Sequence, residues 1–180
     1  MQILSKATSA ASLLLCLVAI ASTNAEGADG ALEAAGSAFL SNGKTIAATH
    51  YRGGLQSLAK FSQLFMIPRT LDGDRFLVLV RQPTRHLSMH RCGAGHEDFL
   101  ALVRFHQADV TLLSKISLQS CENSVDLDLP DATEPDAIIS ALKFDGDQLS
   151  FAVVAPTPDG DLGAPEIRRY RLIKDQFVEQ

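Results

Sequence analysis

A series of short apolar segments separated by turn residues dominates the chain from about residue 75 to its end. These segments have the length and the β-branched, large apolar content of strands. Turn residues lie between them at 107–109, 145–147 and 174–175, and glycine in such turns adopts positive φ without steric cost. The segments read RFLVLVRQ, DFLALVRFH, VTLLSKISLQS, ISALKF, LSFAVVAP, IRRYRLI and QFVE. We therefore predict a mainly β, antiparallel, hairpin-rich domain of about seven strands, built as a sandwich or a half-open barrel.

The residues before position 75 give weaker signals. An alanine-rich stretch that ends at Asn42-Gly43 favours a short N-terminal helix near Leu32–Phe39, although a mobile leader would have the same composition. Farther on, Leu55 and Leu58 have helical spacing, whereas residues 63–69 fit a strand that leads into a turn. We expect a strand in the second half of that stretch.

The first 25 residues have the layout of a secretory signal peptide. Lys6 precedes the apolar run LLLCLVAI, and small and polar residues follow up to Ala25. The run is shorter than the roughly 20 residues that span a bilayer. We predict cleavage before Glu26, export to the periplasm or the extracellular space, and three regions: a signal peptide (1–25), a mobile or short-helical leader (26–50) and a single β-rich domain (51–180).

Net charge limits the range of partners. The chain has a formal net charge of −5, whereas nucleic-acid binding needs a basic surface that displaces counterions. An acidic domain is also unsuited to an anionic membrane surface, and no second apolar stretch is long enough to span a membrane. We expect a protein partner, no nucleic acid and no integral membrane segment after cleavage.

Cys92 and Cys121 are the cysteines that remain after cleavage, and an even pair in an exported chain predicts a disulfide. If residues 98–106 and 110–120 form a hairpin around a three-residue turn, paired positions sum to 216, and these cysteines sum to 213. They would therefore lie near each other at the open end of the hairpin. Closing a loop of about 30 residues stabilises a fold by roughly 3–4 kcal/mol.

Other chemistry around Cys92 has to be weighed against the disulfide. His86, His90, Cys92 and His96 are potential zinc ligands, but their spacing fits no usual zinc motif. His96, Glu97 and Asp98 supply acid–base groups for a hydrolase, but no G-x-S-x-G motif or other reacting partner accompanies them. We assign no catalytic residue, metal or cofactor, and we keep a small-ligand or metal binder and a hydrolase as alternative functions.

Acidic residues cluster directly after Cys121. The segment VDLDLPDATEPDA could insert into the cationic cleft of a partner, and it could equally be a solvated connection between strands. Its acidic residues are Asp126, Asp128, Asp131, Glu134 and Asp136. With the size, the export signal and the disulfide, this segment favours a protein-binding module, such as an inhibitor of, or immunity protein against, a secreted or cell-wall hydrolase.

Two other charged segments carry weaker signals. Asp159, Asp161 and Glu166 partly match a calcium loop but lack a third aspartate. The basic segment IRRYR, residues 167–171, is expected to bind an anionic ligand or acidic partner, or to be an edge strand that its charges protect from aggregation.

Overall fold

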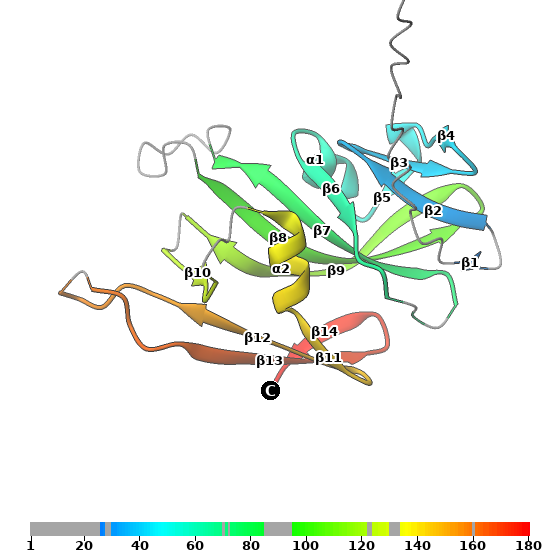
Figure 1. Cartoon of the computed structure of the whole chain (residues 1–180). Helices are drawn as coiled ribbons and strands as arrows, with labels where there is room; N and C mark the ends of the chain where they lie inside the picture. Colours follow the sequence, from blue (N-terminus) through cyan, green and yellow to red (C-terminus); the bar gives the residue numbers. More distant parts are fainter. Residues whose placement is uncertain are drawn as a thin grey trace, which may run out of the picture.

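The chain folds as three layers of β-sheet (Figure 1). The computed structural model describes residues 26–27, 30–69, 71, 73–84, 95–121, 124–129, 134–159 and 161–180. The N-terminal sheet has the order β1-β2-β3-β4, the central sheet β5-β9-β8-β7-β6, and the C-terminal sheet β10-β12-β13-β14 with β11 also paired to β12. This confirms the predicted mainly β, sandwich-like fold, and the described strands do not close into a barrel.

The strands of the N-terminal and central sheets follow one another along the chain, with two short helical segments between β4 and β6. The N-terminal sheet contains β1 (Glu26–Gly27), β2 (Gly30–Ala35), β3 (Ala38–Ser41) and β4 (Lys44–Thr45). After a 3-10 turn (Ala48–His50), the central sheet contains β5 (Tyr51–Arg52), β6 (Gln63–Met66), β7 (Arg75–Pro83), β8 (His96–His106) and β9 (Asp109–Ser120), with α1 (Leu55–Ala59) between β5 and β6.

The C-terminal sheet consists of β10 (Asp126–Leu127), β11 (Lys143–Asp145), β12 (Gln148–Val154), β13 (Glu166–Ile173) and β14 (Gln176–Glu179), and α2 (Pro135–Ala141) connects β10 to β11. The predicted strand at residues 139–144 is therefore only half right, because α2 takes its first residues. The basic segment is an edge strand only at its start, because β12 pairs along all of it, whereas β14 pairs with β13 only from Tyr170 onward.

The central sheet is buried on both faces, which explains the continuous apolar run of β7. The even-numbered residues of β7, Phe76, Val78 and Val80, pack toward the N-terminal sheet and α1. Leu77 and Leu79 point the other way, into a second core shared with α2 and the C-terminal sheet. Two separate cores therefore lie on the two faces of one sheet.

Residues 30–45 form strands, so the expectation of a helix near Leu32–Phe39 is wrong. Asn42 and Gly43 connect β3 to β4 with φ values of 50° and 71°. Positive φ at both positions suits a tight two-residue hairpin turn, the usual role of Asn-Gly. Leu32 and Phe39 are buried in the core beneath this sheet, so the segment packs on residues 51–110 instead of forming a separate leader.

The β8–β9 hairpin is tighter at its turn than expected and irregular along its length. Gln107 and Ala108 form a two-residue turn with positive φ, so that His106 pairs with Asp109. Two register shifts follow, one between Leu102 and Val103 and one between Asp98 and Phe99. Each shift adds a residue to β9 and changes which side chains face which core.

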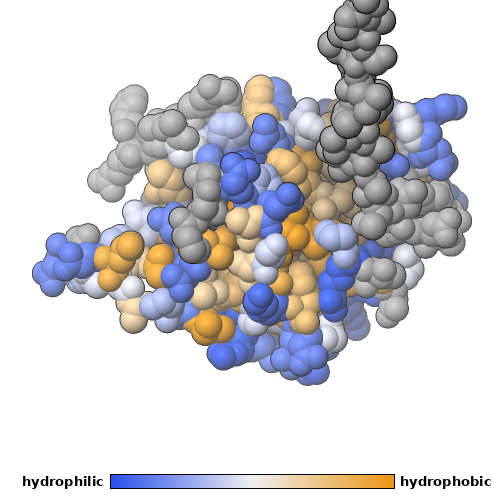
Figure 2. Space-filling model, viewed as in Figure 1, coloured by the Kyte–Doolittle hydropathy of each residue, from blue (hydrophilic) through white to orange (hydrophobic). Residues whose placement is uncertain are grey.

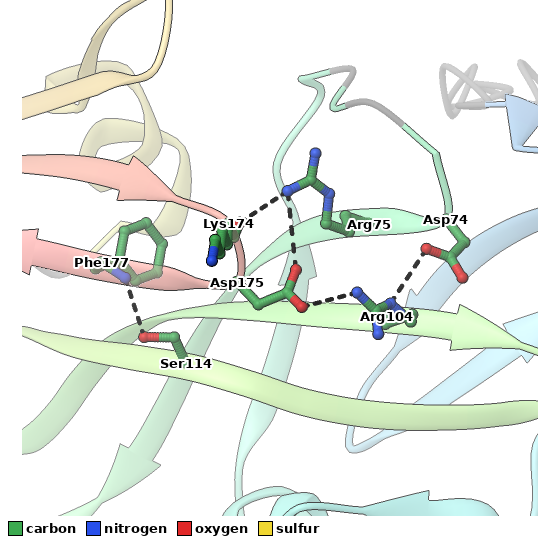
Figure 3. A network of polar contacts seen from close by, with 7 residues as sticks. All are labelled: Asp74, Arg75, Arg104, Ser114, Lys174, Asp175 and Phe177. Atoms are coloured by element: carbon green, nitrogen blue, oxygen red, sulfur yellow. Dashed lines mark hydrogen bonds and ion pairs between the residues drawn. The ribbon is translucent and has the colours of Figure 1, made fainter.

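A network of arginines and aspartates fixes the turn between β13 and β14 against the central sheet (Figure 3). Arg75 Nη1 donates to the carbonyl oxygen of Lys174 over 2.8 Å, and Arg104 Nη2 donates to Asp175 Oδ2 over 2.9 Å. Arg75 and Arg104 are direct cross-strand partners, an arrangement of like charges that is unfavourable alone. Asp175 lies between them and offsets this repulsion. Asp74 also pairs with Arg104, at 3.3 Å.

Candidate functional site

A groove of about 410 Å³ lies where α2 crosses the edge of β12. β10 pairs with one end of β12 and β11 with the other, and α2 connects these two strands. Small and apolar residues form most of the wall, and Asp128 and Lys143 supply its charges. The lining residues are Asp128, Leu129, Ala137, Ser140, Ala141, Lys143, Ser150, Phe151, Ala152 and Ile167.

Of the predicted acidic residues, Asp128 lines this groove, and Asp126, Glu134 and Asp136 lie on or beside the two elements that contribute to it, β10 and α2. Leu127 is buried in the core, so strand alternation turns Asp126 and Asp128 outward, and Asp128 lines the groove itself. Asp136 lies four residues before the groove-lining Ser140, on the same side of α2. Glu134 directly precedes the same helix, and all four of these acidic residues are exposed. Asp131 lies outside the described residues.

The geometry suits a basic side chain with an aliphatic stem. Ala137, Ala141 and Phe151 offer apolar wall surface, and Asp128 adds a carboxylate to the wall. Lysine and arginine bury their methylene stems against apolar surface while the charged head stays near water or a carboxylate. Lys143 also lines the groove, and its ammonium donates to the backbone oxygen of Ser140 over 3.2 Å.

The residues considered for a hydrolase lie in the central sheet, away from this groove. Asp98 is fully buried and accepts two hydrogen bonds from Arg81, at 3.0 Å from Nε and 3.0 Å from Nη2. Gln119 Nε2 also donates to Asp98, over 2.6 Å. Because side chains alternate along β8, Glu97 points to the opposite face from His96 and Asp98. The three residues thus do not converge on one site.

Sequence reasoning did not identify Asp98 as one half of a buried structural ion pair with Arg81. Arg81, Asp98 and Gln119 are register partners on β7, β8 and β9. The register shift beside Asp98 lets Gln119 contact a carboxylate that shares the face of Leu100. The only sign of this ion pair in the sequence is that three polar residues occupy paired positions on β7, β8 and β9. These positions can be recognised as paired only once the strand register is known.

The structure describes only one of the two cysteines of the predicted disulfide. Cys121 follows β9 and is disulfide-bonded, whereas Cys92 lies outside the described residues, so the pairing of the two stays a prediction. His86 and His90 also lie outside them. Across the part of the chain that the structure describes, no three histidine, cysteine or acidic side chains are close enough to hold a metal ion, and this includes Asp159, Asp161 and Glu166.

A second polar cluster lies beside the β8–β9 turn. His50 Nδ1 is 2.8 Å from Asp109 Oδ1, and Arg52 Nε is 3.3 Å from Asp109 Oδ2. The hydrogen bond from His50, aided by the nearby charge of Arg52, lowers the pKa of the Asp109 carboxyl below its usual value. All three side chains are exposed, so the cluster joins β5 to the β8–β9 hairpin at the surface.

Comparison with known proteins adds no relative: no protein-family model, curated protein or solved structure matches the chain. Within the described ranges, no helix is long and apolar enough to cross a membrane. The interpretation of the groove therefore depends on its own chemistry.

Proposed function

We propose that this chain is an exported protein-binding module that holds a basic segment of a partner protein in the acidic groove beside α2. The observation that supports this proposal is the carboxylate of Asp128 in the groove wall, with the exposed Asp126, Glu134 and Asp136 on or beside the adjoining β10 and α2. A partner with a cationic cleft, such as a hydrolase that acts on an anionic cell-wall polymer, has matching charge. Binding there would make the chain an inhibitor of, or immunity protein against, that hydrolase.

Exposed charges of this kind control recognition more than they control folding. Complementary charges speed association and select the partner, and the small side chains in the wall leave room for an inserted stem. Removing three carboxylates at about 0.5 kcal/mol each weakens binding by roughly tenfold. This effect decreases as salt rises, because the Debye length falls to about 3 Å at 1 M ionic strength.

The test compares two triple variants that remove the same charge. Asp126→Asn, Asp128→Asn and Asp136→Asn are combined in the groove variant. The control combines Asp145→Asn at the end of β11 with Asp159→Asn and Asp161→Asn in the connection between β12 and β13, none of which lines the groove. The readouts are the Kd for a purified basic lysozyme and the inhibition of its cell-wall lysis, at low and high salt. Tenfold weaker binding by the groove variant alone supports the proposal, whereas equal affinities would overturn it.

Export and the disulfide have a separate test. Intact mass of the protein from its native host, with and without reductant, reports the first residue and the thiol state. A mass that begins at Glu26, with no alkylation before reduction, agrees with cleavage of residues 1–25 and with a Cys92–Cys121 bond. A retained leader or two free thiols would contradict this part of the proposal.

A further inference from the structure

We propose that the outer face of the C-terminal sheet is an interface between two copies of this chain, paired about a two-fold axis. We define the outer face as the side of β10, β12, β13 and β14 that points away from the central sheet. The C-terminal sheet is the lower layer in Figure 1, and its inner residues Leu149, Phe151, Val153 and Tyr170 pack into the core. The alternate residues of the same strands form the outer face.

The outer face carries three large apolar side chains that are exposed to solvent. Ile167, Ile173 and Val178 are 49%, 46% and 38% exposed, and they account for three of the five large apolar side chains that are exposed in the described residues. Figure 2 shows apolar and polar residues interspersed along the lower border of the molecule. Apolar residues that gather on one face mark interaction sites, whereas isolated ones need no explanation.

Charge is distributed unevenly over this face. Asp126 and Asp128 lie at the β10 end, opposite Val154 and Ala152 of β12. Arg169 and Arg171 lie two strands away on β13, where they pair with Ser150 and Gln148. The acidic end and the basic end are thus at diagonal corners, with Ala152 and Ile167 between them.

A two-fold axis that lies in the plane of the interface, between the acidic end and the basic end, would pack the two outer faces against each other. It would place each acidic end over the basic end of the other copy. Such an interface is isologous, so every contact is made twice. Arg169 and Arg171 are both exposed. Arg171 donates from Nε to Asp147 over 2.7 Å, and a guanidinium has further N–H groups for a second carboxylate. Self-complementary charge therefore favours a second copy over an unrelated partner.

The size of the outer face sets the expected affinity. β10, β12, β13 and β14 have 2, 7, 8 and 4 residues, and at about 3.3 Å per residue and about 4.8 Å between strands they cover roughly 330 Å². A standard stable interface buries about 800 Å² per partner. We therefore expect a weak dimer, with a Kd in roughly the micromolar range. Dimerisation would also cover Asp126 and Asp128, so that binding of a basic partner and self-association compete.

The experiment uses charge reversal on both ends of the outer face. Sedimentation velocity over a concentration series compares the unchanged protein with Arg169→Glu/Arg171→Glu and with Asp126→Lys/Asp128→Lys. Each variant alone places like charges together at both contacts, and we expect at least tenfold weaker association. An equimolar mixture restores the dimer, because one contact keeps its original charges and the other pairs glutamate with lysine.

A matched variant, Lys44→Glu/Lys60→Glu, makes the same change of charge on exposed residues outside the C-terminal sheet and should associate like the unchanged protein. Circular dichroism verifies that all variants are folded. A monomer at all concentrations up to about ten times the expected micromolar Kd, a dimer that both reversed variants retain, or a mixture that stays monomeric would each overturn the proposal.

The same variants separate this proposal from the proposed function. Arg169→Glu/Arg171→Glu keeps the acidic groove, so it should still bind a basic lysozyme while losing the dimer. If the unchanged protein dimerises but does not bind lysozyme, the proposed function fails. If it binds lysozyme but stays monomeric, the dimer proposal fails.

Discussion

Replacing Arg81 with methionine removes the cation from a carboxylate that lies fully buried in the central sheet. Asp98 is 0% exposed and Arg81 is 7% exposed, and two hydrogen bonds of 3.0 Å join them. Gln119 would still donate to Asp98, but an amide does not compensate a negative charge. Methionine fills much of the volume of the arginine stem, so the change is mainly electrostatic.

The expected loss follows from this burial. Breaking a buried ion pair by removing one partner costs about 3–5 kcal/mol, because a buried charge is left without compensation. For a domain of this size, about 2–4 °C of melting temperature is lost per kcal/mol, so the midpoint should fall by roughly 6–20 °C. Urea unfolding followed by far-UV circular dichroism measures the free energy, provided that unfolding is two-state.

Arg171→Met is the matched control. Arg171 and Asp147 form an ion pair of 2.7 Å, but their side chains are 46% and 50% exposed. Exposed pairs contribute about 0–1 kcal/mol, so this variant should melt within a few degrees of the unchanged protein. If Arg81→Met costs no more than Arg171→Met, Asp98 is not a buried charge that depends on Arg81, and the reasoning is wrong. A variant with Arg81→Met, Asp98→Leu and Gln119→Leu should regain most of the loss, because apolar residues can replace a buried pair.

Two further outcomes test the backbone and the surface. A methyl group at Gly53, where φ is +65°, overlaps the backbone oxygen of Leu112, so Gly53→Ala should cost clearly more than the about 1–2 kcal/mol of positive φ alone. Gly54→Ala, with φ +84° and open space, should cost only that amount, and equal costs in urea unfolding would refute the argument. His50→Phe removes the hydrogen bond that lowers the pKa of Asp109, so NMR titration should show that pKa rise toward 3.8. A carboxyl whose folded-state pKa is lowered stabilises the fold above about pH 4 and loses this effect as pH falls through the folded value, so the variant should lose less stability in acid.

Strand positions after residue 75 were predictable because the apolar segments and the turn residues between them indicate the same strand boundaries. The apolar run RFLVLVRQ forms β7, and the Lys174-Asp175 turn joins β13 to β14 as expected. The faces of β9 were not predictable. Alternation would put Val110, Leu112, Ser114, Ile116 and Leu118 together, but Val110 packs toward the N-terminal sheet and Leu118 toward the C-terminal sheet. Two register shifts separate them, and a bulge has no reliable local signal.

The N-terminal region shows how one dipeptide supports two readings. Asn-Gly ends helices and also makes hairpin turns, because both need positive φ. The alanine-rich stretch before it has good helix propensity, yet Leu32 and Phe39 are buried beneath a small sheet. Burial of these two side chains outweighs the propensity of the alanines, which is a weak preference.

The acidic residues of the candidate site were found from the sequence, but the groove was not. Charge density alone singled out the segment, and it predicted one loop pinned by the disulfide. The structure divides that segment between β10 and α2. Asp128 and Ser140 line one groove only because both elements meet the same edge of β12. That meeting depends on pairings with β12, a strand that begins 20 residues after Asp128. A site built from such pairings requires the topology, whereas its charge can be read directly from the chain.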